Sequence, residues 1–391
     1  MAYGGTERFI INLGKWVCKQ NQEATLMGRG FFATITVQHL PRGCGKAAYE
    51  IINGRRRNKI EYLPHTIYFL SAFITVPSWI IQGLIINNKS QITLIHAQDT
   101  GYGGLAAVIL GKLLKVPVIL SSHGIRHKGL EYLIGKRLKK IIIRFEYTLD
   151  IFNIENANCL LVVNNSIKEY FEHIICKKVD VIPAPIKLDN FEFSKINRDA
   201  VRRELEIDDK TIIIGYVGRF SSEKNLLTLI NAFADVTHIN PSIKLVMVGA
   251  GPKEAQIKKT IFQRCIEDKV ILCGVRYDIG KLLSSFDIFV LPSYTEGLAA
   301  ALLEAMASGR ALICSDIPAH KELLTHNEDA VLFNPYTKES LKDAILLLLS
   351  NDSLRFKLGQ NAKRKVWSYD EEIIFPKILR YYEDVCIKFS K

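Results

Sequence analysis

Several familiar signatures of function are missing from this chain of 391 residues. The eight cysteines are scattered and form no C-x-x-C pair, which argues against a zinc site or a disulfide framework and favours reduced thiols. No complete G-x-G-x-x-G motif opens a helix, so a nicotinamide cofactor is not indicated. The first apolar run is interrupted by Glu7, Arg8 and Lys15, and no signal peptide is expected. Short internal repeats and low-complexity tracts are absent, although the two halves look like two copies of one architecture.

Excess positive charge is confined to the first half of the chain. Residues 1–190 contain 24 Lys and Arg against 13 Asp and Glu, a net charge of +11, whereas residues 191–391 contain 28 against 27, a net charge of +1. The two values add to the +12 of the whole chain. Such asymmetry predicts an anionic partner for the first half alone. Nucleic acid is not expected as that partner, because the basic residues are not interleaved with aromatic ones and no nucleic-acid-binding motif is present.

Alternating strand and helix patterns predict an α/β protein with two domains. A length of 391 residues exceeds what one core usually covers, and a hydrophobic content of 48% is typical of a globular chain. Strand-like runs alternate with helix-like ones through both halves, which is typical of parallel βαβ units. The predicted strands lie near residues 23–28, 35–40, 91–97, 117–122, 157–163, 179–183, 211–217, 244–249, 269–273, 286–291, 311–315 and 330–333. The predicted domains span residues 1–190 and 191–370, followed by a helix at 371–391.

The stretch 289–309, FVLPSYTEGLAAALLEAMASG, contains two carboxylates in an informative arrangement. It reads as a buried strand, a short polar loop and an Ala/Leu-rich helix, which places Glu296 in the loop and Glu304 just inside the helix. The small residues at the helix start let a ligand approach backbone N–H groups that lack an intrahelical partner and carry the positive end of the helix dipole. Those N–H groups suit a diphosphate, and the carboxylates suit hydroxyl groups on either side. The pattern therefore predicts a site for a sugar linked to a nucleoside diphosphate.

A second group of residues follows the predicted strand 211–217. Arg219 and Lys224 would lie at the carboxyl end of a parallel strand, where open α/β sheets bind ligands. Two cations there can neutralise a pyrophosphate and the charge that develops on it as it leaves. Either residue alone is equally compatible with a solvated surface. Together with the two glutamates and the glycine loop Val248–Pro252, they favour a diphosphate site.

At these residues the chain resembles the retaining, metal-independent glycosyltransferases of the GT-B fold, of the family 4 type (glycosyl transferases group 1). The matching segments span nearly the whole chain in the family's order, and the second half matches best. They are specific for the fold and the reaction class and unspecific for the sugar. The segments are GGTER at 4–8, IHAQD at 95–99, SHG at 122–124, Gly218-Arg219 with Lys224, VGAGP at 248–252 and EGLAAALLE at 296–304.

The resemblance implies two Rossmann-like, doubly wound domains that face a cleft. Residues 1–190 would bind the acceptor, residues 191–370 would bind the nucleotide sugar, and the helix at 371–391 would cross back to pack on the N-terminal domain. Members of the family normally have a strand ahead of the glycine pair, whereas only Met1-Ala2-Tyr3 precede it here, which leaves the first strand missing. We expect the true start of the chain to lie upstream.

The resemblance also implies roles for individual residues. Arg219 and Lys224 would hold the diphosphate, Glu296 would orient sugar hydroxyls, and His123 would contact the sugar or the acceptor. A lone histidine at that position is as compatible with a structural role. The residues expected to bind the donor are Gly4, Gly5, Gly218, Gly249, Gly251, Val275, Arg276, Gly297, Leu298, Ala299, Ala300 and Glu304. Of these, Glu304 would bind the ribose, and the backbone around residues 275–276 would meet the base.

The expected mechanism is front-face substitution. Retention by double displacement needs an enzyme carboxylate close to the anomeric carbon, and no candidate stands out in the N-terminal half. The resemblance instead implies that the departing phosphate helps to take the acceptor proton, while the enzyme supplies positioning and charge stabilisation. No Asp-x-Asp motif occurs, so a metal-bridged donor is not expected, and neither is any other cofactor.

Two motif positions depart from the family's pattern. The segment Val181–Ile186 stands where many relatives have Pro-Asn-Gly, which weakens expectations about donor details more than about reaction class. Ala250 stands where an acid is common. The backbone geometry of that loop, set by Gly249 and Gly251, is expected to survive.

Two further segments bear on membranes. The run 66–88 has no charged residue and approaches spanning length, but Pro77 and several polar residues interrupt it, so a core or interfacial helix is expected. Residues 128–145 show apolar residues at helical spacing opposite a basic side. This pattern fits either an ordinary amphipathic helix or one that binds anionic lipid, to which Arg55–Arg57 and Lys59 could add. Relatives that assemble surface polysaccharide often use lipid-linked acceptors. This fact and the basic amphipathic segment together predict a cytoplasmic enzyme that is peripheral on the inner face of the plasma membrane.

Three functions remain open from the sequence. The first is sugar transfer in cell-surface polysaccharide or lipopolysaccharide synthesis. The second is another enzyme of the same fold, such as an epimerase or a phosphorylase. The third is a non-catalytic or partner-dependent subunit that binds a sugar nucleotide, which the missing first strand makes conceivable. The combination of Arg219 and Lys224 with Glu296 and Glu304 favours transfer.

Overall fold

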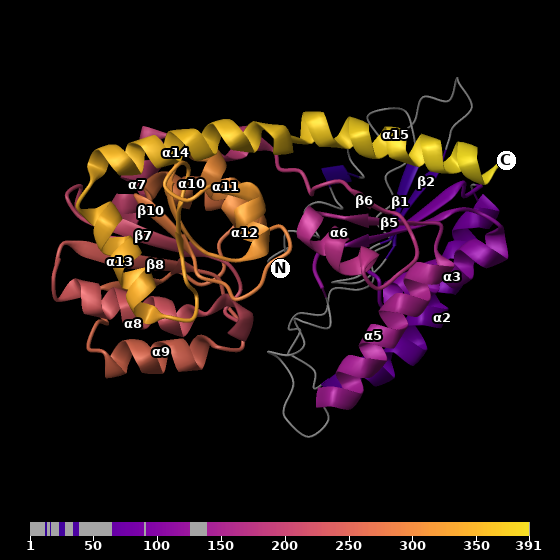
Figure 1. Ribbon diagram of the computed structural model, residues 1–391, viewed down its shortest axis with the longest axis horizontal. Helices are drawn as coiled ribbons and strands as arrows, with labels where there is room; N and C mark the ends of the chain where they lie inside the picture. Colours follow the sequence, from indigo (N-terminus) through magenta and orange to yellow (C-terminus); the bar gives the residue numbers. More distant parts are fainter. Residues whose placement is uncertain are drawn as a thin grey trace. The chain divides into compact units, whose positions relative to one another are not determined.

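The computed structural model describes residues 12–13, 16, 23–27, 34–38, 65–89, 91–125 and 139–390, which form two compact units (Figure 1). One unit is Pro185–Glu371, and the other contains the described residues up to Ala184 and those after Glu371. Each unit contains one six-stranded sheet. The sequence placed the boundaries at residues 190 and 370, and in the structure the chain passes between the units after residues 184 and 371.

The N-terminal unit has the strand order β1-β2-β3-β4-β5-β6. Its elements are β1 (Glu23–Met27), β2 (Thr34–Gln38), α2 (His65–Lys89), β3 (Leu94–Ala97), α3 (Tyr102–Leu114), β4 (Val118–Ser122), α5 (Lys139–Asn156), β5 (Cys159–Val162), α6 (Asn165–Glu172), β6 (Val179–Val181) and α15 (Glu371–Phe389). Strands β3 to β6 pair in parallel, as expected for βαβ units.

Strand β2 departs from the parallel pattern predicted for this half. It pairs antiparallel with β1 on one side and with β3 on the other. The connection 28–33 between β1 and β2 is too short to hold a crossover helix, so the two strands can only run in opposite directions.

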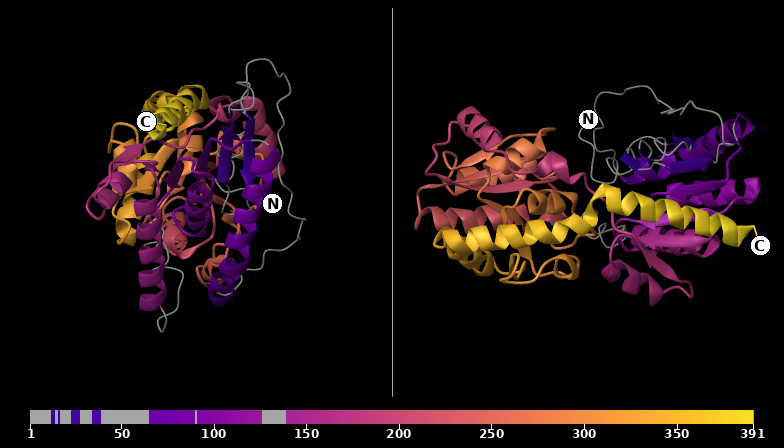
Figure 2. Two further views of the ribbon diagram at one scale, coloured as in Figure 1. Left: turned by 90° about the vertical axis from the view of Figure 1, so that its right-hand side faces the viewer. Right: turned by 90° about the horizontal axis from the view of Figure 1, so that it is seen from above.

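Helices cover both faces of the N-terminal sheet (Figure 2). Successive side chains of each strand point to opposite faces, so they pack against different helices. Leu94, Ile119 and Leu161 share a core with Phe375 and Ile378 of α15. The opposite face packs on α3, where glycines bring the helix close to the sheet. The final helix thus belongs to the core of the N-terminal unit, although its residues lie at the far end of the chain.

Helix α2 covers the run predicted as a core or interfacial helix. It packs against α3, burying Val76 and Ile86, while Ile81 and Ile85 are exposed. Pro77 lies inside it. Among the described residues, no helix has the length and apolar character needed to cross a membrane.

The C-terminal unit is built on an all-parallel sheet. Its elements are η1 (Leu188–Phe191), α7 (Lys195–Glu204), β7 (Ile212–Val217), η2 (Ser222–Lys224), α8 (Leu226–Thr237), β8 (Ile243–Val248), α9 (Glu254–Gln263), β9 (Val270–Leu272), α10 (Ile279–Ser285), β10 (Ile288–Leu291), α11 (Ala300–Ala307), β11 (Ala311–Ser315), α12 (Pro318–Leu323), β12 (Val331–Phe333), α13 (Lys338–Leu349), α14 (Asp352–Val366) and η3 (Trp367–Tyr369). All its strand pairs are parallel, so this unit matches the predicted α/β class directly.

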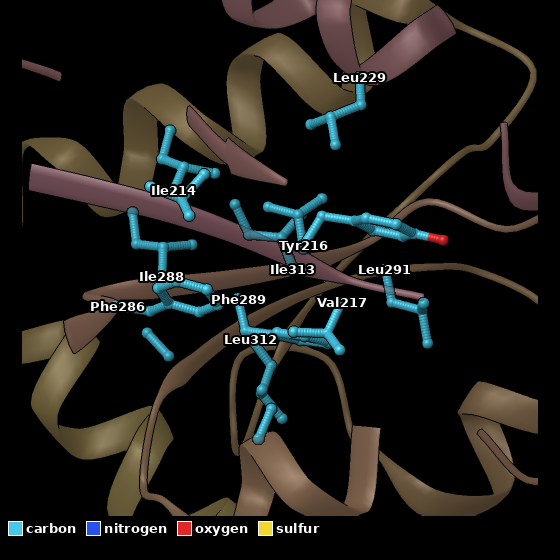
Figure 3. Close-up of a cluster of buried hydrophobic side chains, with 14 of the residues drawn as sticks. Ile214, Tyr216, Val217, Leu229, Phe286, Ile288, Phe289, Leu291, Leu312 and Ile313 are labelled. Atoms are coloured by element: carbon cyan, nitrogen blue, oxygen red, sulfur yellow. The ribbon is translucent and has the colours of Figure 1, made fainter. Parts of the chain in front are cut away.

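The core of this unit surrounds the central strands (Figure 3). Side chains of β7, β10 and β11, including Ile214, Phe289 and Ile313, are fully buried. A parallel sheet covered on both faces needs near-continuous apolar strands, and these sequences supply them. The rigid centre fixes where the strands end, and hence where the polar segments after them begin.

Candidate functional site

The candidate site lies at the carboxyl edge of the C-terminal sheet, where the strand order reverses. The order is β12-β11-β10-β7-β8-β9, so the chain builds outward from β7 through β8 and β9 and then returns to the other side of β7 as β10. Strands β7 and β10 are parallel neighbours, and the segments that follow them therefore start side by side. In open α/β sheets this reversal is where ligands bind. The sheet thereby brings Lys224 and Glu296 together.

An ion pair joins the two segments. Lys224 Nζ lies 2.7 Å from Glu296 Oε1, and Ser293 Oγ donates to the same oxygen at 2.6 Å. The backbone adds a link, since Tyr294 N donates to Glu223 O at 2.8 Å. Among the described residues, none bonds to Oε2 of Glu296. One carboxylate oxygen is therefore held by the protein, and the other can accept a hydrogen bond from a ligand.

The charge state of the site follows from its burial and its partners. Burial would raise the pKa of Glu296, but the charges of Lys224 and His320 and the hydrogen bonds from Lys224 and Ser293 together hold that pKa below its ordinary value. Glu296 is therefore an ionised carboxylate near neutral pH, which accepts hydrogen bonds and donates none. Burial, with the charges of Glu296 and Glu223, raises the pKa of Tyr216, whose hydroxyl donates to Arg219 O at 2.9 Å.

Glycines allow the loop around Arg219 to pack tightly. Gly249 has φ +139°, and a Cβ there would lie 1.9 Å from Gly218 O. A Cβ on Gly251 would lie 2.4 Å from Phe220 O, and Phe220 N donates to Ala250 O at 2.9 Å. The two loops therefore support each other through their backbones, and Ala250 takes part through its carbonyl alone. Contact of these glycines with a donor stays a prediction.

The start of α11 has the small residues that the sequence indicated. Helix α11 begins after Ala299, which supplies no side-chain cap. Gly297, Leu298, Ala299 and Ala300 are all half-buried. Glu304 lies inside the helix with 2% of its surface exposed. Its predicted contact with a ribose is not tested by this geometry.

Residues 275–276 follow β9 at the same edge of the sheet. Gly249 N donates to Gly274 O at 2.7 Å, which ties this segment to the loop after β8. Arg276 forms ion pairs with Asp278, 2.7 Å away, and with Glu204 of α7. The hydrogen bonds that Arg276 donates to these two carboxylates raise its pKa. Because the guanidinium is held by its own ion pairs, the backbone of Val275-Arg276 remains the part expected to meet a base.

Sequence reasoning missed three residues of this site. Ser293 lies three residues before Glu296, and Glu223 lies directly before Lys224. His320 lies on α12, after β11, and β11 is the parallel neighbour of β10. Ligands bind at the carboxyl ends of parallel strands, and this rule applies to β11 as well as to β7 and β10. Applied to the predicted strand 311–315, it could have identified His320 from the sequence.

In the N-terminal unit, His123 belongs to a buried chain of polar groups. His123 Nε2 lies 2.8 Å from Gln98 Oε1, and Gln98 Nε2 lies 3.1 Å from both ring nitrogens of His96. His96 in turn bonds to Tyr382 Oη at 2.6 Å and Ser121 Oγ at 2.7 Å. Burial lowers the pKa of His123 to about 4, and burial with the His123 charge lowers that of His96 to about 3. Both imidazoles are therefore neutral at pH 7.

Some predicted residues lie outside the described part of the chain. These are Gly4 and Gly5, the basic residues 55–59 and the first part of the amphipathic segment, 128–138. The remainder of that segment begins α5. Across the described ranges, no group of three or more His, Cys, Asp and Glu side chains is placed to hold a metal ion. Metal independence itself stays a prediction.

Two family models match the chain, one in each half. Residues 197–365 match the model described as Glycosyl transferases group 1, and residues 3–190 match the model described as Glycosyltransferase Family 4. The chain is 28% identical over 262 residues to the N,N'-diacetylbacillosaminyl-diphospho-undecaprenol alpha-1,3-N-acetylgalactosaminyltransferase of Campylobacter jejuni, covering 65% of this chain and 68% of that one. It is 26% identical over 290 residues to the UDP-Gal:alpha-D-GlcNAc-diphosphoundecaprenol alpha-1,3-galactosyltransferase of Escherichia coli, covering 72% of each.

Among solved structures, the chain is similar to the sucrose-phosphate synthase of Thermosynechococcus elongatus. The TM-score is 0.72 at 21% identity, covering 84% of this chain and 81% of that one. At this identity, the likeness concerns the fold.

Proposed function

Because the chain belongs to the glycosyltransferases of the GT-B fold, of the family 4 type, we propose that it moves a sugar from a nucleoside-diphosphate donor to a saccharide or lipid-linked saccharide acceptor. Transfer proceeds with retention of configuration and without a metal ion, in cell-surface polysaccharide or lipopolysaccharide synthesis. The observation that carries the proposal is the Lys224–Glu296 pair at the reversal of the C-terminal sheet.

Lys224 can serve two partners at once. An ammonium group has three N–H donors, and one is directed at Glu296 Oε1. In the proposed role the other two bond to phosphate oxygens, with Arg219 and the start of α11, where no side chain caps the helix, as further partners of the diphosphate. Two cations and a helix N-terminus would stabilise the negative charge that grows on the diphosphate as the sugar leaves.

Glu296 orients the transferred sugar in this scheme. Its Oε1 is held by Lys224 and Ser293, so the carboxylate plane is fixed while Oε2 faces no partner among the described residues. A sugar hydroxyl that donates to Oε2 would be placed relative to a diphosphate bound by Lys224. Positioning of this kind, with the departing phosphate taking the acceptor proton, needs no enzyme nucleophile.

The acceptor is proposed from the relatives and from the surface of the N-terminal unit. Both relatives named above are, by their names, transferases of diphospho-undecaprenol-linked substrates. On α5, Lys140 and Arg144 are exposed together with Ile141 and Phe145, whose exposed fractions are 67% and 42%. Basic and apolar side chains exposed on one helix suit an anionic bilayer surface, which supports a peripheral position on the inner face of the plasma membrane.

The first test is a binding screen of the full chain by thermal shift, without metal. UDP, GDP and ADP would be compared with their common sugar conjugates. A ligand at one hundred times its dissociation constant adds about 2.7 kcal/mol of stability, which is readily measured. We expect one nucleotide and its sugar conjugate to shift the melting temperature selectively. Transfer to an undecaprenyl-diphosphate-linked sugar would then be assayed with that donor, and the anomeric configuration of the product read by NMR.

Each outcome of this screen separates the candidate functions. Selective binding with transfer supports the proposal, and inversion of configuration in the product would contradict the retaining mechanism. Selective binding without transfer to any acceptor tested favours a partner-dependent subunit. If a folded sample shows no shift with any nucleotide, the proposed function is wrong.

A further inference from the structure

His320 is a buried histidine of the candidate site that has no role in the proposed transfer reaction. It lies on α12 with 1% of its surface exposed, and its Nδ1 lies 2.9 Å from Ser315 O. A carbonyl only accepts, so Nδ1 must be the protonated nitrogen that donates to it. The remaining nitrogen, Nε2, then carries a lone pair and acts as an acceptor.

That acceptor is unsatisfied. Nε2 of His320 is buried and bonds to none of the residues that the structure describes. Polar atoms in protein interiors are almost always paired, and an unpaired one destabilises the fold or marks a functional contact. Protonating Nε2 would not resolve this, because burial lowers the pKa of His320 even though the charge of Glu296 and the hydrogen bond to Ser315 oppose the change.

His320 and Glu296 lie at the same edge of the sheet. Glu296 follows β10 and His320 follows β11, its parallel neighbour in the sheet, and the charges of Glu296 and Lys224 both affect the pKa of the imidazole. No hydrogen bond connects His320 to Glu296, as expected for two acceptors. Two acceptors that share a region without bonding each other are complementary to a group that donates hydrogen bonds, and sugar hydroxyls do so.

We propose that Nε2 of His320 accepts a hydrogen bond from a hydroxyl group of the transferred sugar, beside the one that Glu296 Oε2 accepts. His320 is then a further donor-binding residue that helps to select which sugar is transferred. This inference rests on the proposed function, since it needs a nucleotide sugar at the site. It also requires a local rearrangement around His320 when the donor binds, because Nε2 is closed to solvent in this conformation.

Two substitutions of His320 distinguish the role of Nδ1 from that of Nε2. In His320→Asn, the side-chain amide can still donate to Ser315 O as Nδ1 does, but nothing reaches the position of Nε2. In His320→Gln, the longer side chain can place its oxygen near that position and keep an acceptor there. His238→Asn, at an exposed histidine after α8, makes the same chemical change away from the site.

The experiment measures dissociation constants of the full-length variants by calorimetry. The probes are UDP, GDP and ADP, and UDP-glucose, UDP-N-acetylglucosamine, GDP-mannose and ADP-glucose. The quantity compared is the ratio of the dissociation constant of the bare nucleotide to that of its sugar conjugate. We expect His320→Asn to lower this ratio about tenfold without changing nucleotide affinity, as loss of one buried hydrogen bond would. His320→Gln should retain most of the ratio, and His238→Asn all of it.

Several results would overturn the proposal. An unchanged ratio in His320→Asn means that His320 only anchors the turn through Ser315. Equal weakening of nucleotide and conjugate means that the substitution distorts the whole site. Should the wild type bind no nucleotide at all, the proposed function fails, and the role of His320 fails with it.

A second measurement covers the case in which His320→Asn does not fold. In wild-type protein with ¹⁵N-labelled histidine, the Nε2 resonance of His320 should shift with the selected nucleotide sugar and stay unchanged with the bare nucleotide. Identical spectra with both ligands would contradict the proposal.

Discussion

The C-terminal unit holds Lys224 and Glu296 through contacts within one edge of one sheet, whereas the N-terminal unit holds His123 through Gln98 and His96 to Tyr382 on the last helix. In the first case the residues follow adjacent parallel strands, so the strand order alone brings them together. In the second case the partner lies 286 residues further along the chain than His96. The positions of site residues thus depend on neighbouring strands in the C-terminal unit and on contacts between distant parts of the sequence in the N-terminal unit.

The two units also differ in charge and in surface. The first half of the chain carries nearly all of the +12 net charge, and its α5 exposes apolar residues beside basic ones. The second half is almost neutral, and Lys224 at the candidate site is paired with Glu296. This contrast predicts that donor binding depends on the C-terminal unit and membrane binding on the N-terminal unit, and each expectation can be tested separately.

The largest expected effect is that of Glu296→Ala on turnover. Loss of the carboxylate removes the predicted sugar contact and leaves Lys224 without its partner, so we expect about a 10²- to 10³-fold lower turnover, comparable to the loss of a transition-state contact. Steady-state kinetics with the donor found in the screen measures it. Glu296→Gln keeps the shape, and Glu339→Ala changes an exposed carboxylate of the same unit. Near-normal turnover in a folded Glu296→Ala protein would remove Glu296 from the mechanism.

Gly249→Ala should produce the next largest effect, this time on stability. The added Cβ would meet Gly218 O at 1.9 Å, and the φ of +139° disfavours any side chain. We expect about 3 kcal/mol of destabilisation and a fall of about 10 °C in the melting temperature of the C-terminal unit. Gly124→Ala is the control, since a Cβ there meets nothing within 4 Å. If the two variants melt alike by calorimetry, the loop contact is not important for stability.

Charge reversal on α5 tests the surface of the other unit. Lys140→Glu with Arg144→Glu should weaken binding to anionic vesicles about 30-fold or more, because each basic residue near the surface contributes about 1 kcal/mol. Vesicle co-sedimentation with phosphatidylglycerol measures the change. Lys259→Glu with Lys357→Glu alters net charge equally on exposed positions of the C-terminal unit. Equal binding by both double variants would show that overall charge, and not α5, determines association.

Acid should destabilise the N-terminal unit more than the C-terminal unit. The folded pKa values of His96 and His123, about 3 and about 4, lie below the ordinary 6.5, so below pH 6.5 the unfolded chain binds more protons than the folded one. Their contribution is complete above pH 6.5 and declines as the pH falls toward 4, by up to about 1.4 kcal/mol per pH unit for each histidine.

In the C-terminal unit, one buried histidine, His320, has a pKa lowered in the same direction. Hydrogen exchange measured at pH 7, 6 and 5, corrected for the intrinsic rate, should therefore show a steeper loss of protection in β3 and β4 than in β7 and β10. His96→Gln should reduce the difference. Parallel losses in both units would contradict the assignment of the acid response to His96 and His123.

The smallest expected effect is that of Tyr382→Phe. It removes one buried hydrogen bond to His96 and leaves the ring packing in place, so we expect about 1 kcal/mol of destabilisation and a fall of about 2–4 °C. Tyr277→Phe, at an exposed tyrosine of the C-terminal unit, is the matched control. Calorimetry that shows no difference between the two would indicate that the buried chain contributes little to docking of α15.

The fold was largely predictable because its signals are local. The runs 117–122 and 211–217 correspond to β4 and β7, since an apolar stretch between turn residues indicates a strand wherever it lies. The antiparallel pairing of β2 with β3 was not predicted, because pairing direction depends on which strands become neighbours and no periodic pattern records that.

The residues of the candidate site also fall into those that local sequence predicts and those that depend on tertiary contacts. Arg219, Lys224 and Glu296 could be proposed because each follows a predicted strand, and strands of a parallel sheet end at one edge. His320 was not proposed, because its importance depends on burial, on a bond to Ser315 and on the charge of Glu296, and these exist only after β10 and β11 have paired.

The sequence by itself determined the type and order of the elements and the edge of the sheet that carries the polar residues, since these depend on spacing along the chain. Only the tertiary structure decided which atoms meet. It placed Lys224 and Ser293 on Oε1 of Glu296 and none of the described residues on Oε2, and it joined His96 to Tyr382 of the final helix. Hydrogen bonds require positions within a few tenths of an ångström, and such positions are set by the packing of distant segments and not by local patterns.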